Sequence, residues 1–223
     1  YENETESKLL KRISEQIESK GVIEVLRKGV KDRGSHFDLV YFQPKSGLNP
    51  EHHDLYKKNR FIEVRQVYYS NQNENSIDMG LFLNGLPILT MELKNQLTGQ
   101  NVKHSENQYR NDRDPKEPLL QFKRCMVHFC VDNNKVSMTT RLSGSKTFFL
   151  PYNQDLENPP VEKGYRTKYL WEKILIPSSL LDIIENFVHV SKGKEFFFNN
   201  KTQKIDTKIK EVLIFPRYHQ LDL

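Results

Sequence analysis

The sequence predicts an α/β fold in which helices lie on both sides of a mixed, largely antiparallel central sheet. Apolar residues at helical spacing between positions 9 and 17 predict a first helix, and Gly21 ends it. β-branched and aromatic runs such as 61–69 and 125–131 predict strands. Two apolar runs flank Asn84-Gly85 and predict a hairpin, because Asn-Gly is the strongest short-range hairpin signal.

The other elements follow from the same two hydrophobic periods. Helices are expected over 22–30, 51–58, 102–112, 169–176 and 178–190. Strands are expected over 36–42, 76–83, 86–94, 135–140 and 148–152. Asn158-Pro159-Pro160 indicates a boundary, so we expect one domain over 1–158 and a helical linker region over 159–213. Within that region, the Lys- and Asn-rich segment 192–210 is expected to be the linker itself.

Composition limits the possible functions. The 223 residues suffice for a large buried core, and the net charge of +5 is compatible with a polyanionic partner such as DNA. The mean hydropathy of −0.71 argues against a membrane protein, and no apolar run approaches the roughly 20 residues of a membrane helix. Two cysteines argue against a disulfide scaffold and for a reducing compartment, which predicts a cytoplasmic protein.

Charged residues within the apolar hairpin strands predict a site. Asp78 lies in the first strand, and Glu92 and Lys94 lie two residues apart in the second. Buried carboxylates are usually kept only when they are paired or bound to a metal. Two carboxylates can hold Mg²⁺, which polarises a phosphate and lowers the pKa of a bound water, while a lysine offsets developing negative charge. This residue set suits metal-dependent hydrolysis of phosphodiesters.

The hairpin register tests this hypothesis. A regular two-residue turn at Asn84-Gly85 would pair Asp78 with Met91 and put Glu92 on the opposite face of the sheet. We therefore predict either a three-residue loop, Asn84-Gly85-Leu86, or a bulged strand, because either one would bring Asp78 and Glu92 to one face. The structural alternative is that Asp78 pairs with Lys94 in a salt bridge and Glu92 faces solvent.

Several segments carry a resemblance to a known family. They are NRFIEVRQVYYS (59–70), IDMGLFLNGLPILTMELKN (77–95), QYRNDRDP (108–115) and QFKRCMVHFCVD (121–132). With the Asp78…Glu92-x-Lys94 pattern, they resemble the N-terminal nuclease region of the restriction (R) subunit of type I restriction–modification enzymes. That region is a member of the PD-(D/E)xK nuclease superfamily.

The resemblance implies an endonuclease domain for double-stranded DNA, attached to an ATP-dependent translocating motor. The implied partners are methyltransferase and specificity subunits, in the cytoplasm of a bacterium or archaeon. By the same resemblance, Asp78 and Glu92 bind Mg²⁺ (or Mn²⁺ in its place), the main-chain carbonyl of Leu93 is a further ligand, and Lys94 supports catalysis.

Further residues take their expected roles from position and resemblance. Many family members have a Gln-x-x-x-Tyr motif on the helix after this strand, which makes Gln108 a candidate for the site, although Tyr109 follows it directly. Arg110 and Arg113 are candidates for contact with DNA phosphates. The segment 214–223 resembles the start of a superfamily 2 helicase motor, with Gln220 as a candidate adenine contact. The phosphate loop that would bind ATP is not in this sequence, so we expect no ATP hydrolysis by this chain.

Two other functions stay open at this point. The chain could be a catalytically degenerate module that binds DNA or docks a subunit. It could also be a nuclease of another system, such as a repair enzyme, although the motor-like end at 214–220 favours the restriction subunit.

Overall fold

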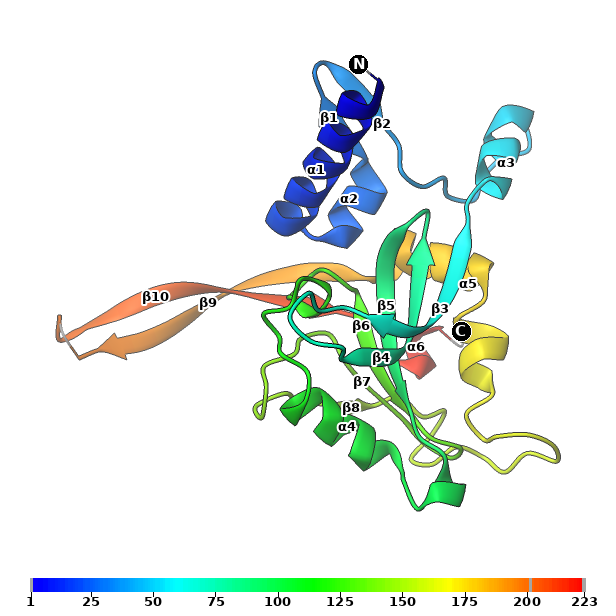
Figure 1. Ribbon diagram of the computed structural model, residues 1–223, viewed down its shortest axis with the longest axis vertical. Coiled ribbons are helices and arrows are strands. Elements are labelled where there is room, and N and C mark those ends of the chain that lie inside the picture. The colour runs from blue at the N-terminus through cyan, green and yellow to red at the C-terminus, as the bar shows by residue number, and fades with distance from the viewer. Residues whose placement is uncertain (1, 201, 222–223) are drawn as a thin grey trace.

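A six-stranded mixed sheet forms the centre of the computed structural model, which describes residues 2–200 and 202–221 (Figure 1). In spatial order the strands are β3 (Phe61–Tyr68), β4 (Ser76–Leu83), β5 (Leu86–Leu93), β6 (Val127–Val131), β7 (Val136–Thr139) and β8 (Leu150–Pro151). Only the β5–β6 pair in this sheet is parallel, and all other neighbours are antiparallel. The expected mixed α/β architecture is confirmed.

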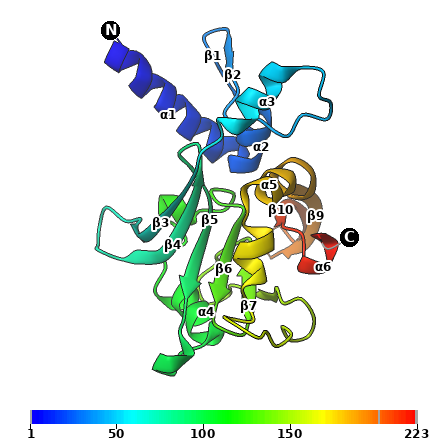
Figure 2. The ribbon, with the colours of Figure 1, turned by 90° about the vertical axis from the view of Figure 1, so that its right-hand side faces the viewer.

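Helices cover the sheet and extend beyond it. The α-helices are α1 (Glu2–Lys20), α2 (Val22–Lys28), α3 (Pro50–Lys57), α4 (Val102–Asn111), α5 (Pro177–Asp182) and α6 (Tyr218–Leu221). Short 3₁₀ and π turns are η1 (Gln96–Thr98), η2 (Pro118–Leu120), η3 (Leu170–Ile174) and η4 (Ile183–Phe187). Gly21 has φ of 91°, a left-handed conformation that suits glycine, and it ends α1 as expected. In Figure 2, α1 projects away from the sheet, whereas α5, α6 and the strands β9 (His189–Asn199) and β10 (Lys204–Ile214) lie together on one side of the molecule.

The alternation of side chains along the strands gives the sheet two different faces. One face carries Leu89, Met91 and Phe129 and packs in a large apolar cluster with α2, α5 and η4. The other face carries Thr90 and Glu92, together with the side chains that α4 covers. A smaller apolar cluster lies on that second side, formed by Ile77, Val102, Tyr109, Leu120, Cys130, Leu142 and Phe149. The candidate residues therefore lie beneath α4.

Two expectations about secondary structure are wrong. The strand expected over 36–42 ends at Phe37, where β2 (Ser35–Phe37) has paired with the short β1 (Val30–Asp32). The helical linker is correct for 170–187 but wrong for 189–214, which forms two strands, β9 (His189–Asn199) and β10 (Lys204–Ile214). These strands pair in one unbroken antiparallel register from Ile214↔His189 to Lys204↔Asn199. They form a ribbon that extends far from the body (Figure 1).

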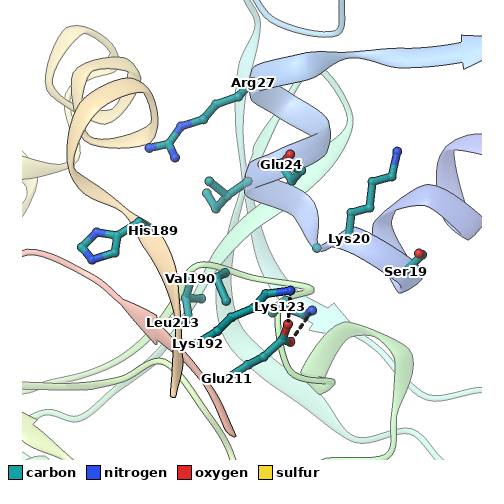
Figure 3. Close-up of a pocket in the computed structure, with 12 residues that line it drawn as sticks. Ser19, Lys20, Glu24, Arg27, Lys123, His189, Val190, Lys192, Glu211 and Leu213 are labelled. Atoms are coloured by element: carbon teal, nitrogen blue, oxygen red, sulfur yellow. Dashed lines mark hydrogen bonds and ion pairs between the residues drawn. The ribbon is translucent and has the colours of Figure 1, made fainter. Parts of the chain in front are cut away.

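Ion pairs and hydrogen bonds hold the base of this ribbon on the body (Figure 3). The Glu211 carboxylate lies between two ammonium groups, with Lys123 Nζ at 2.8 Å and Lys192 Nζ at 3.1 Å. Leu213 is buried, and its carbonyl accepts a hydrogen bond from Thr140 Oγ1. The large apolar cluster accordingly includes residues from both sides of position 158, from Ile17 to Tyr218. The division of the chain into domains at 158 and 213 stays a prediction.

Candidate active site

A β-bulge brings the two candidate carboxylates to the same face. Asn84 and Gly85 form a two-residue turn with φ of 49° and 85°, the positive values of a type I′ hairpin turn. Leu83 pairs with Leu86 and Phe82 with Pro87, but the next pairs are Leu81↔Leu89, Gly80↔Thr90 and Met79↔Met91. Ile88 is the extra residue of the bulge. The same register continued by one residue places Asp78 opposite Glu92.

The expectation of a loop or a bulge is thus confirmed in its second form, and the three-residue loop is wrong. The two-residue turn and the Asp78–Glu92 pair are compatible because one residue is added to β5 after the turn. Ile88 itself is fully buried in the large apolar cluster, which explains why the strand can bulge there without exposing apolar surface.

Asp78 lies at the centre of the polar contacts. Its Oδ2 accepts a hydrogen bond of 2.7 Å from the main-chain N–H of Leu93, and Lys94 Nζ lies 3.7 Å from the same oxygen. The Lys94 side chain is only 12% exposed, so its ammonium group acts at short range on this carboxylate. The Asp78–Lys94 pair of the structural alternative is therefore present. The other half of that alternative is wrong, because Glu92 is fully buried and does not face solvent.

The buried Glu92 carboxylate has one partner for two oxygens. Its Oε1 accepts a hydrogen bond of 2.8 Å from Arg113 Nε, and its Oε2 is buried without a hydrogen-bond partner in the part of the chain that the structure describes. Burial raises the pKa of Glu92 to about 7, the Arg113 charge opposes this rise, and the neighbouring Asp78 carboxylate adds to it. Leaving Oε2 buried without a partner costs free energy, which a further partner for this oxygen would recover.

A network of buried polar groups fixes α4 over the site. The Thr90 hydroxyl lies 2.7 Å from the Tyr109 hydroxyl and 2.6 Å from His128 Nδ1. Ser105 Oγ on the same helix donates a hydrogen bond of 3.3 Å to the Glu92 carbonyl. These contacts join α4 to β5 and β6 directly beside Glu92, so the helix and the strand that carries the carboxylate hold one relative position.

Among the other predicted site residues, only Arg113 is bonded to this centre within the part of the chain that the structure describes. Gln108 is on α4 but makes no hydrogen bond to Asp78, Glu92 or Lys94 among the described residues, and its buried Oε1 has no partner there. Arg110 is occupied by the Thr147 carbonyl and by Glu106.

Gln220 is also engaged, because its side chain accepts a hydrogen bond from the Arg217 main chain. Arg113 was expected to contact DNA phosphate, but it is 7% exposed and points inward onto Glu92.

Sequence reasoning gave Arg113 the wrong environment, although a signal was available. A glutamate embedded in an apolar strand needs a cation if it is to be buried. Arg113 lies two residues after the end of α4, the helix that covers Glu92, so this residue was the natural partner to consider.

The donors suit a magnesium ion. Asp78, the free Oε2 of Glu92 and the Leu93 carbonyl would supply oxygen ligands, the type that Mg²⁺ prefers. Within residues 2–200 and 202–221, no group of three or more His, Cys, Asp or Glu side chains is placed to hold a metal ion. Mg²⁺ requires fewer, because it is commonly bound through one or two carboxylates with water and substrate phosphate completing the shell. The buried Glu92 Oε2, which has no partner among the described residues, is the observation that fits a bound Mg²⁺.

The described part of the structure also has two cavities. One, of about 770 Å³, is on the opposite face of the sheet, between Met91 and Trp171, and it reaches the candidate site at Lys94. The second, of about 410 Å³, lies at the base of the ribbon (Figure 3). Its Lys123 and Lys192 are paired with Glu211, and Arg27 donates to two main-chain carbonyls. Neither cavity brings together the groups that the proposed chemistry needs.

Comparison with known proteins identifies the family. A family model described as the type I restriction enzyme R protein N terminus matches residues 1–147. The search of curated proteins found no match to the chain. Among the described residues, no helix is long and apolar enough to span a membrane. The match includes both strands of the bulged hairpin, α4 and Arg113. The chain therefore belongs to the family of type I restriction enzyme R protein N termini.

Proposed function

We propose that this region is the Mg²⁺-dependent endonuclease domain of the R protein, a PD-(D/E)xK nuclease that hydrolyses DNA phosphodiester bonds. The bulge in β5 carries the proposal, since it places Asp78 opposite Glu92 with Lys94 beside Asp78. Family membership supports a restriction role and association with DNA within a restriction–modification complex. In that complex, methyltransferase and specificity subunits would select the site, and an ATP-dependent motor would translocate the DNA.

The residues divide the chemistry between them. Asp78, Glu92 Oε2 and the Leu93 carbonyl would hold Mg²⁺, which supplies a Lewis acid and lowers the pKa of a bound water. Lys94 carries a positive charge to the same edge and offsets the negative charge that develops on the phosphate. The Leu93 N–H donates to Asp78 Oδ2 and holds that carboxylate in place, while Arg113 occupies the other oxygen of Glu92.

Calorimetric titration of Mn²⁺ into folded protein tests the metal site. Wild type should bind, and Glu92→Gln and Asp78→Asn should lose binding, because each removes an anionic oxygen. Glu63→Gln is the matched control, since Glu63 is an exposed carboxylate on the neighbouring strand β3. Loss of binding in all four proteins would contradict the proposal, and so would retention of full affinity in Glu92→Gln.

Cleavage by the assembled restriction complex tests the catalytic assignment. Alanine at Asp78, Glu92 or Lys94 should abolish DNA cleavage while ATP hydrolysis by the motor continues. Full cleavage by any of the three variants would overturn that residue's role.

One observation favours a second candidate, a degenerate module that binds DNA or docks a subunit. The Arg113 charge already compensates Glu92, so the buried pair can exist without a metal. Wild type that binds a short DNA duplex but no Mn²⁺, with or without that duplex, would select this function.

A further inference from the structure

Arg113 joins the two strands that carry the candidate metal ligands. Its Nε donates to Glu92 Oε1 on β5 at 2.8 Å, and its Nη2 donates to the Ser76 carbonyl on β4 at 2.8 Å. Ser76 is two residues before Asp78 on the same strand. The guanidinium group also lies over the Tyr69 ring, 5.9 Å from its centroid. One planar cation therefore contacts both sides of the site.

The guanidinium has little freedom to leave this position. Arg113 follows the last turn of α4, and that helix is fixed to the sheet by Tyr109, Thr90 and Ser105. The side chain is 7% exposed, and its donors are directed to fixed acceptors by the planar geometry of the guanidinium group. A surface phosphate contact would need an exposed guanidinium, which this arrangement does not provide.

The pairing is also selective between the two Glu92 oxygens. Oε1 is occupied by Arg113, and Oε2 has no hydrogen-bond partner among the described residues. A carboxylate held by one oxygen cannot rotate freely, so its second oxygen keeps one direction. That is the arrangement of an outer partner that orients a metal ligand.

We propose that Arg113 is a positioning residue that holds Glu92 by Oε1 and leaves Oε2 directed to the metal ion. This inference rests on the proposed metal site and adds a residue to it. Arg113 stays on Glu92 when the ion binds, and its bond to the Ser76 carbonyl keeps β4 and β5 at the spacing that the two carboxylates need.

Mn²⁺ calorimetry with three arginine variants tests the assignment, with folding checked by circular dichroism. Arg113→Gln should weaken Mn²⁺ binding by about 10- to 100-fold, the usual range for loss of an outer partner. Arg113→Lys should recover part of the affinity, because an ammonium group restores the charge without the fork geometry. Arg27→Gln is the matched control, since Arg27 also donates to buried main-chain carbonyls but lies on α2, on the opposite face of the sheet.

A second measurement does not depend on folding of the Arg113 variants. Without metal, the Nε–H resonance of Arg113 in Glu92→Gln is expected to be shifted from its position in the wild type. When Mg²⁺ saturates the wild type, this resonance should stay at its protected position. A resonance that moves to the position of exposed arginines would show that the ion displaces Arg113, and would overturn the inference.

The calorimetric outcomes separate the two proposals. Wild type that binds Mn²⁺ while Arg113→Gln binds equally well overturns the role of Arg113 alone. An equal loss of affinity in Arg27→Gln also overturns it, because the loss of any part-buried arginine would then suffice. Wild type that binds no Mn²⁺ overturns the metal site, and the role of Arg113 with it.

Discussion

The β4–β5 hairpin and the β9–β10 ribbon are both antiparallel hairpins, but they are built in opposite ways. The first has an irregular register, with Ile88 bulged, and is covered on both faces. The second has eleven pairs in one regular register, and most of its side chains are exposed. Only the irregular hairpin buries a carboxylate.

The two hairpins differ in how strongly their charged side chains interact. The ribbon also carries charged residues, but Glu195 pairs with Lys210 across the strands at 3.5 Å while both stay half exposed. In β5 the same kind of residue is enclosed by α4, and its electrostatic interactions are stronger because water is excluded. The bulge sets the register that brings Asp78 and Glu92 to one face, and the cover of α4 determines how strongly these side chains interact.

The largest expected difference is in the packing of one isoleucine from each hairpin. Ile88→Ala should lower the free energy of unfolding by about 2–5 kcal/mol, because it opens a cavity at a fully buried side chain. Ile209→Ala should change it by less than about 0.5 kcal/mol, since Ile209 is 68% exposed. Urea denaturation of the two variants measures this contrast. Equal losses would mean that the ribbon is packed against something in solution.

The second difference is in pH dependence, and its sign follows from the raised pKa of Glu92. In the folded state this pKa is about 7, against an ordinary value of 4.5, so between these values the folded protein keeps a proton that the unfolded chain has lost. The free energy of unfolding of the metal-free protein should therefore fall as pH rises through this window, by at most about 3 kcal/mol.

Glu92→Gln should remove this slope, whatever its absolute stability, because a glutamine does not titrate. Glu195→Gln in the ribbon should keep the wild-type slope, because this variant leaves Glu92 in place. Denaturation curves across the window measure both variants. A wild-type stability that rises with pH would show instead that attraction to Arg113 outweighs the effect of burial.

The smallest expected difference is between two strand glycines. A Cβ at Gly80 would lie 3.0 Å from Val67 Cγ2 and 3.1 Å from Phe82 Cε2, so Gly80→Ala should cost about 1 kcal/mol. A Cβ at Gly193 in the ribbon would meet nothing within 4 Å. Gly193→Ala should therefore gain a few tenths of a kcal/mol, because alanine restricts the unfolded chain. Thermal unfolding distinguishes these signs, and a stabilised Gly80→Ala would show that Val67 and Phe82 yield easily.

Sequence reasoning succeeded where a local pattern determines the structure. Asn84-Gly85 specified the turn, and the positions of Asp78 and Glu92 required an irregularity between them, which the structure has at Ile88. The location of that irregularity could not be predicted, since it depends on the buried environment of Ile88. The family resemblance was confirmed by the match to residues 1–147, whereas the metal site and its residues stay predictions.

Reasoning failed where composition and structure disagree. The segment 192–210 is rich in Lys and Asn, which is typical of a linker, yet it forms most of the ribbon. The alternation of Ile205, Thr207 and Ile209 is a strand pattern that composition concealed. Arg113 was misplaced for a different reason, because its burial depends on a contact with Glu92, 21 positions earlier in the chain.

The buried contact between Thr90 and His128 has a consequence for how the site responds to acid. Burial lowers the pKa of His128 to about 4, so the imidazole is neutral at every pH near neutrality. The imidazole that bonds Thr90 therefore carries no charge across the range in which Glu92 gains or loses its proton. The buried Thr90–His128 pair therefore keeps the same charge near neutrality. A pH response of the site in this range reports on Glu92 rather than on His128.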